Sequence, residues 1–213
     1  GFVALGALLL AAGLAAARGE VECPARAPAF VPVATGAAPV TAARIARWLV
    51  LAFVPSSLML ALTAKITTDI GALPLLWAIP LALYLVSFTL TFTRRPLIGA
   101  RALRMAFAAG LSILFAAFAG LVNVHAAPWT IALVLPAFFA VALYAHAQLY
   151  EARPDGVHLT LFYVTMSVGG ALGGVFNSVV APWAFDRLWE GPATLLVAAA
   201  LPLLCRAGPV TAG

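Results

Sequence analysis

Two small groups of side chains in this chain of 213 residues have types and spacings suited to acid–base or ion-binding chemistry. Lys65 and Asp69 lie four residues apart, so on a helix they form either a surface ion pair or a functional group at the outer face, as a gate or as a contact for a partner. Gln148 and Glu151 are three residues apart and share one helix face, whereas His146 points elsewhere. Ionisable groups at membrane depth are functional candidates, but groups near the membrane surface more often extend to water.

The sequence predicts no metal, cofactor or catalytic site. The three histidines lie at unlike depths in the apolar runs, and Cys23 and Cys205 are too far apart in sequence to indicate a metal site or a disulfide framework. The glycines of residues 169–174 do not form a phosphate-binding loop, because no strand precedes them and no glycine–lysine pair follows them. We therefore expect a non-enzymatic chain.

A glycine-rich stretch within the apolar run 158–181 gives the strongest packing signal. Glycines recur there at a spacing of four, and two polar residues follow one turn later: Gly169, Gly170, Gly173, Gly174, Asn177 and Ser178. On a helix these residues form one bare stripe. Glycine weakens a helix in water by about 1 kcal/mol relative to alanine, but in lipid every backbone group is bonded within the segment. The stripe is predicted to admit a second helix, either as a packing contact or beside a substrate path.

The composition of the chain indicates a membrane protein. Hydrophobic residues make up 64% of the sequence and charged residues 9%, with a mean hydropathy of +1.08, whereas a soluble domain has about 25% charged residues. Apolar runs recur along the whole chain, which excludes a secreted protein with one signal peptide. The net charge of +5 points to lipid headgroups and cytoplasmic loops rather than nucleic acid.

The fold class predicted from these runs is all-α, a polytopic membrane bundle of six to seven transmembrane helices. A span needs about 20 apolar residues. We expect a partial transmembrane helix at 1–17, a Pro- and Ala-rich cytoplasmic linker at 18–44, a helical bundle at 45–205 and a cytoplasmic tail at 206–213. The spans expected within the bundle are 45–67, 70–92, 103–122, 129–150, 158–181 and the shorter run 193–205.

Prolines interrupt several of the expected spans. Pro55, followed by Ser56 and Ser57, lies in the span 45–67, and Pro74 and Pro80 lie in the next one. Broken helices mark substrate sites at the midplane of many transporters. Proline is also simply tolerated in membrane helices, where neighbouring hydroxyl groups bond the freed carbonyls. Both interpretations of these helix breaks remain open from the sequence.

The distribution of arginine predicts the orientation of the chain. If 18–47, 93–104, 151–157 and the tail after 205 are cytoplasmic, ten arginines lie inside, and only Lys65 and Arg187 lie outside. This alternation holds through every span and predicts a multi-pass protein of the bacterial inner membrane with a cytoplasmic C-terminus. Trp129, Trp183 and Trp189 then fall at the outer ends of spans, as in an interfacial aromatic belt.

Several stretches in a fixed order resemble the membrane part of bacterial fused transporter-like (MFS-type)/spermidine synthase proteins. The resemblance covers about residues 45–192 and rests on 48–60, 66–70, 74–85, His146, 153–154, 158–160, 162–163, 167–177, 181–182, 185–186, Glu190 and Pro192. It implies that an aminopropyltransferase-like domain follows the membrane part in the parent protein. These 213 residues contain no such domain, so the family's synthase chemistry is not expected of them.

The chain departs from the family pattern at three positions that bear on ion handling. Lys65 stands where the family pattern leads us to expect histidine, Gln148 where it has glutamate, and Leu161 where it again has glutamate. Two carboxylates and one imidazole are thus altered together. This argues against a family-type site for protons or cations and favours a scaffold.

Three hypotheses for function follow. The chain is a non-catalytic membrane module of a spermidine-synthase-like protein, acting as an anchor or scaffold or as a permease for a small cationic or hydrophobic substrate. Alternatively, it is an accessory subunit packed against other membrane protein subunits, or a transporter half that needs a partner half. The last hypothesis predicts a polar, water-accessible cavity near Pro55 and Pro74, and a packed interior there would contradict it.

Overall fold

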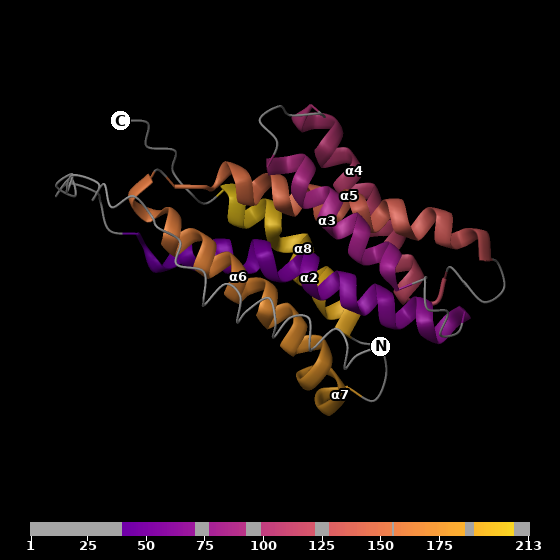
Figure 1. Cartoon of the computed structure of the whole chain (residues 1–213). Coiled ribbons are helices and arrows are strands. Elements are labelled where there is room, and N and C mark those ends of the chain that lie inside the picture. Colours follow the sequence, from indigo (N-terminus) through magenta and orange to yellow (C-terminus); the bar gives the residue numbers. More distant parts are fainter. Residues whose placement is uncertain are drawn as a thin grey trace, which may run out of the picture. The chain divides into compact units, whose positions relative to one another are not determined.

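The structure is a computed structural model that describes residues 40–70, 77–92, 99–121, 128–154, 156–185 and 190–206. These residues form helices and no strand (Figure 1). The α-helices are α2 (Ala42–Ile70), α3 (Ala78–Phe92), α4 (Ala100–Phe118), α5 (Ile131–Glu151), α6 (Leu159–Val175), α7 (Ala181–Ala184) and α8 (Glu190–Arg206). Short 3-10 turns, Pro128–Thr130 and Gly156–His158, precede α5 and α6, and a π-helical turn, Phe176–Val180, joins α6 to α7.

Four helices in the described residues are long and apolar enough to cross a membrane: Ala42–Asp69, Ala100–Phe118, Ile131–Glu151 and Gly156–Ala184. The helices α3 and α8 are apolar but shorter. The all-helical fold is therefore confirmed for the described residues, whereas six to seven crossings are not. The expected partial helix at 1–17 and the linker up to residue 39 lie outside the described residues, and α2 begins three residues before the expected boundary at 45.

The helix α2 lies at the centre of the packing. It contacts α3, α5, α6 and α8, and its buried apolar side chains recur every three or four residues along its whole length: Trp48, Leu51, Val54, Leu58, Leu62 and Ile66. Such spacing keeps side chains on the faces that meet neighbouring helices. In lipid, these contacts are held together by close packing and polar bonds between helices.

The expected break in α2 needs correction. The helix is continuous through Pro55, which is buried inside it. Pro80 lies in the first turn of α3, where a missing N–H leaves no intrahelical bond unmade. Pro74 lies outside the described residues. Proline is accommodated here as an ordinary residue of a membrane helix.

The helices α2 and α6 run in the same direction. Gly169 of α6 faces Leu49 of α2, and eight residues further along both helices Asn177 bonds to Ser57. The two helices lie side by side in Figure 1, where α2 is indigo and α6 is orange. Both helices therefore begin at the same end of the bundle.

The helices α4 and α5 run in opposite directions. The ring of Phe107 stacks on Tyr144 with 4.2 Å between centroids, and three residues later Gly110 packs against the carbonyl of Ala137. The start of α4 therefore lies beside the end of α5. This is the arrangement of two consecutive membrane crossings.

The described arginines gather at one end of the bundle. The indole Nε1 of Trp48 donates a 3.0 Å hydrogen bond to the carbonyl of Ala152, so the end of α5 meets the start of α2. With the directions above, one end of the bundle holds Arg44, Arg47, Arg101, Arg104 and Arg153, and we call it the arginine end. Lys65 lies near the other end of α2. The relative directions of α2, α4, α5 and α6 are those predicted from the distribution of arginine.

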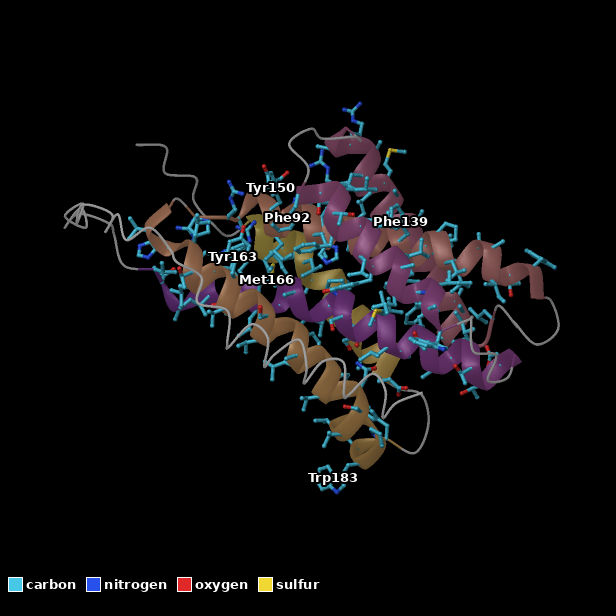
Figure 2. The ribbon with its side chains drawn as sticks, viewed as in Figure 1. Phe92, Phe139, Tyr150, Tyr163, Met166 and Trp183 are labelled. Atoms are coloured by element: carbon cyan, nitrogen blue, oxygen red, sulfur yellow. The ribbon has the colours of Figure 1, made fainter. Side chains whose placement is uncertain are left out.

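Three exposed tryptophans lie at the end opposite the arginine end, and one of them is Trp77, which directly precedes α3 and is 55% exposed. Trp129 precedes α5 and is 71% exposed, and Trp183 in α7 is 90% exposed. Figure 2 shows Trp183 turned away from the other labelled side chains. Trp189 lies outside the described residues. The positions of Trp129 and Trp183 relative to the helices are those expected of an interfacial belt.

Candidate functional site

The closest approach between helix backbones in the glycine stretch is made by Gly169 and Gly173. A methyl group at Gly169 would lie 2.6 Å from the carbonyl oxygen of Leu49. A methyl group at Gly173 would lie 2.9 Å from both the carbonyl oxygen of Phe53 and the amide nitrogen of Ser57. Only hydrogen fits at these two positions, so the glycines allow α6 to rest directly on the backbone of α2.

The other half of the glycine stretch needs correction. A methyl group at Gly170 or Gly174 would meet no heavy atom within 4 Å. Residues in the next sequence position are rotated by about 100° around a helix, so these two glycines lie on an adjacent face. The hydroxyl of Ser178 is exposed and donates to the carbonyl of Gly174 in its own helix. The expected single stripe is thus two stripes, of which one contacts α2.

A chain of hydrogen bonds, buried at Ser57 and Thr194 and partly buried at Asn177, joins α6, α2 and α8, and we call it the polar node. The amide Nδ2 of Asn177 donates to Ser57 Oγ at 2.7 Å and to the carbonyl of Gly173 at 2.9 Å. Thr194 Oγ1 donates to the carbonyl of Glu190 at 2.8 Å. Because that bond uses the only hydroxyl proton of Thr194, Ser57 donates in the 2.7 Å contact between the two hydroxyls. Every side-chain proton of the polar node therefore has an acceptor.

The polar node lies where α6 changes its winding. Asn177 belongs to the π-helical turn, a rare conformation that is frequent at functional positions. Its Oδ1 atom is buried and has no hydrogen-bond partner in the described structure. Nearby, Ser56 Oγ donates to the carbonyl of Gly170 at 2.9 Å. Both serines beside Pro55 therefore bond to neighbouring helices, and this was not expected from the sequence.

His146 is buried between α3 and α5, away from water. Its side chain is 1% exposed, and its Nδ1 lies 2.9 Å from Ser87 Oγ. Since the Ser87 hydroxyl donates to the carbonyl of Tyr84, the His146 Nδ1–H donates to Ser87. The rings of Tyr84 and Phe88 meet His146 edge-on with centroids 5.1 Å and 5.4 Å away. The expectation that His146 reaches the membrane surface is therefore corrected.

The remaining polar candidates are separate from His146 and from one another. Gln148 Nε2 donates to Glu151 Oε2 at 3.0 Å in an exposed contact at the arginine end. Lys65 Nζ lies 3.0 Å from Asp69 Oδ2, and each side chain is 14% exposed. The ring of Phe118 lies 5.9 Å from the same Nζ. The structure places these groups at opposite ends of the bundle, so they do not form one site.

Some residues of the site gave no signal in the sequence. Thr194 and Ser87 are hydroxyl residues within apolar runs, and their partners lie 137 and 59 residues away in the chain. Gly110 also allows close packing, with a methyl group there lying 2.6 Å from the carbonyl oxygen of Ala137. It has no second glycine one turn away. A search for any small or hydroxyl residue inside apolar runs would have included all three.

No family model, no curated protein and no solved structure matches the chain. The described residues also contain no group of three or more His, Cys, Asp or Glu side chains that could hold a metal ion. What the site does must therefore be argued from its geometry. That geometry joins helices: the glycines bring two backbones together, and the polar node ties a third helix to them.

Proposed function

We propose that this chain is a non-catalytic membrane module that acts as an anchor or scaffold in the bacterial inner membrane, with a cytoplasmic C-terminus. The observation that carries the proposal is the polar node, whose side-chain donors are all bonded within the protein. Hydroxyl and amide groups that bond one another across helices stabilise a bundle in lipid. The resemblance to the membrane part of transporter-like/spermidine synthase proteins is compatible with such a module.

The interior around Pro55 favours a scaffold over a transporter half. Pro55 is buried, and Val54, Ser57 and Leu58 are each 0% exposed. A substrate site at the midplane needs a water-accessible cavity lined by polar groups. The packed surroundings of Pro55 argue against that cavity, and Pro74 is not described. A permease for a small cationic or hydrophobic substrate is therefore the less favoured form of the proposal.

A second candidate, an accessory subunit of a larger membrane assembly, is favoured by one observation. The face of α6 that carries Gly170 and Gly174 has no neighbour within the described chain. Large apolar side chains elsewhere on α6 and on the π-helical turn after it are also exposed, including Val164 at 55% and Val179 at 62%. Lipid covers such a face equally well. The test of this candidate is therefore whether the chain co-purifies with other membrane proteins. A single monodisperse monomer after mild detergent extraction would count against it.

The experiment that tests the scaffold places a soluble reporter after Gly213. A fluorescent protein that matures only in the cytoplasm should be bright and should resist extraction from membranes by alkaline carbonate. Alkaline phosphatase, which is active only outside, should be inactive in the same position. The opposite pattern would overturn the orientation. For the permease alternative, vesicles that contain the purified protein should accumulate no more radiolabelled polyamine than empty vesicles, and clear uptake would overturn the scaffold.

A further inference from the structure

The described side chains at the arginine end carry more positive than negative charge, with five arginines against Glu151. Three helices, α2, α4 and α6, begin there, and none has an acidic residue in its first turn. Their N-termini bring the positive ends of their helix dipoles there, whereas α3 and α5 end there and bring the negative ends of theirs. Glu151 is exposed and bonded to Gln148. The one ion pair among the described side chains, Lys65 with Asp69, lies at the other end.

Two of the arginines are held by aromatic rings at one corner of this end. The guanidinium of Arg44 lies 5.3 Å from the ring centroid of Trp48, and that of Arg153 lies 5.4 Å from Tyr150. The hydrogen bond from Trp48 to Ala152 brings these two pairs together, since Ala152 directly precedes Arg153. Figure 2 shows Tyr150 beside Phe92, which contacts it at 5.4 Å between centroids. Contacts between aromatic rings and one hydrogen bond therefore fix the positions of Arg44 and Arg153 at this corner.

Two nitrogen atoms near this corner are buried without a partner. Arg47 Nε, in the residue before Trp48, has no hydrogen-bond partner in the described structure, and neither does His158 Nε2. His158 precedes α6 and makes no side-chain cap for it. Phe162, one turn later, packs its ring on Trp48 with centroids 5.2 Å apart. Because buried polar atoms in proteins are nearly always bonded, these two point to a missing ligand.

We propose that this corner binds a phosphate group, held by Arg44, Arg47 and Arg153 with His158 beside them. Guanidinium forks bond phosphate oxygens in pairs, and helix N-termini favour anions. The corner lies at the end of membrane helices, where tryptophan and tyrosine mark the headgroup level. The phosphodiester of an anionic lipid in the adjoining leaflet is the nearest source, and free phosphate carries the same chemistry. The proposal rests on insertion into a bilayer, and it does not depend on what the chain anchors.

The test compares two double variants with the same change in charge at the same end of the bundle. Arg47→Gln/Arg153→Gln alters the corner, and Arg101→Gln/Arg104→Gln on α4 is the matched control, since both of its arginines are exposed. Each protein is placed in nanodiscs of phosphatidylcholine with phosphatidylglycerol, and the anionic lipid retained is measured by native mass spectrometry. Diffuse attraction of about 1 kcal/mol per arginine lowers retention about 30-fold in either double variant. The corner variant also loses charge-assisted hydrogen bonds to the phosphate, so its retention should fall clearly further than that of the control.

The control decides between a built site and general attraction. If Arg101→Gln/Arg104→Gln loses as much lipid as the corner variant, the effect is diffuse charge and the proposal is overturned. A third variant, Arg47→Lys/Arg153→Lys, keeps the charge but loses the fork, so it should recover only part of the retention. Full recovery would overturn the assignment to a guanidinium site. This variant also keeps the test decisive if the glutamine variant fails to reach the membrane.

A second arm distinguishes the two sources of phosphate. The thermal midpoint of the wild-type protein is measured in pure phosphatidylcholine nanodiscs, with either inorganic phosphate or short-chain phosphatidylglycerol added. A larger rise with the lipid assigns the corner to headgroups. An equal rise with inorganic phosphate assigns it to a soluble phosphate instead. No rise with either overturns the proposal, and since the reporter experiment after Gly213 is independent of it, this failure leaves the scaffold function standing.

Discussion

On the face of α6 that meets α2, Gly169 and Gly173 leave room for hydrogen alone. On the adjacent face, Gly170 and Gly174 have the same spacing and meet nothing within 4 Å. The polar residues that follow differ in the same way, because Asn177 bonds across to α2 whereas Ser178 bonds only to its own helix. Identical residue types at identical spacing thus have opposite roles.

The difference between the two faces comes from α2, not from α6. The backbone of α2 is accessible to Gly169 and Gly173 because its own residues at the contact are small: the Cβ atoms of Ala52 and Ser56 each lie 3.0 Å from where a glycine methyl group would be. In lipid, apolar residues gain little by leaving one apolar environment for another. A glycine pair in one helix therefore allows a close contact, which forms only where the neighbouring helix also has small residues at the facing positions.

The largest expected effect is a reversal of sign between the two faces when glycine is replaced by alanine. Gly169→Ala and Gly173→Ala should each destabilise the protein by about 1–3 kcal/mol, because the new methyl group presses on the backbone of α2. Gly170→Ala and Gly174→Ala should be neutral or stabilising by up to about 1 kcal/mol, because the methyl group enters open space and alanine favours the helix. Unfolding by sodium dodecyl sulfate in mixed micelles measures all four.

The matched pairs make the result interpretable. Gly169 and Gly170 differ by one position in the same helix, so changes in helix propensity cancel between them. Equal destabilisation at both positions would show that the second face also has a neighbour. That outcome would contradict the division of the glycine stretch and support a partner on the open face.

The sequence predicted the kind of fold and only part of the site. High apolar content makes a membrane bundle predictable, and the spacing of Gly169 and Gly173 is visible in one segment. What the sequence does not contain is the pairing between segments, because Ser57 meets Asn177, which lies 120 positions further along the chain. His146 shows the same limit, since its distance from the end of an apolar run suggested contact with water. Contacts with Ser87, Tyr84 and Phe88 of α3 bury it instead.

The second prediction concerns the polar node, which exists only on the contact face. Ser57→Ala combined with Thr194→Val should show a coupling energy of about 0.6 kcal/mol in a double-mutant cycle, the typical strength of a hydrogen bond between membrane helices. Asn177→Ala should cost about 1–2 kcal/mol because it removes two bonds and the contact between α6 and α2. Ser178→Ala is the control and should change stability by less than about 0.5 kcal/mol. Zero coupling between Ser57 and Thr194 would place their hydroxyls apart in the membrane.

The smallest expected effect tests whether the two faces are independent. Ser56 Oγ reaches from α2 to the carbonyl of Gly170, although the Cα of Gly170 faces open space. Ser56→Ala should therefore cost only about 0.6 kcal/mol, since it removes one bond and keeps the methyl-sized contact. In the Gly170→Ala background the same cost is expected, because the new methyl group points away from α2 and cannot disturb that bond. A departure from additivity beyond about 0.5 kcal/mol in the same unfolding assay would place the methyl group of residue 170 in contact with α2. The two stripes of α6 would then act as one surface.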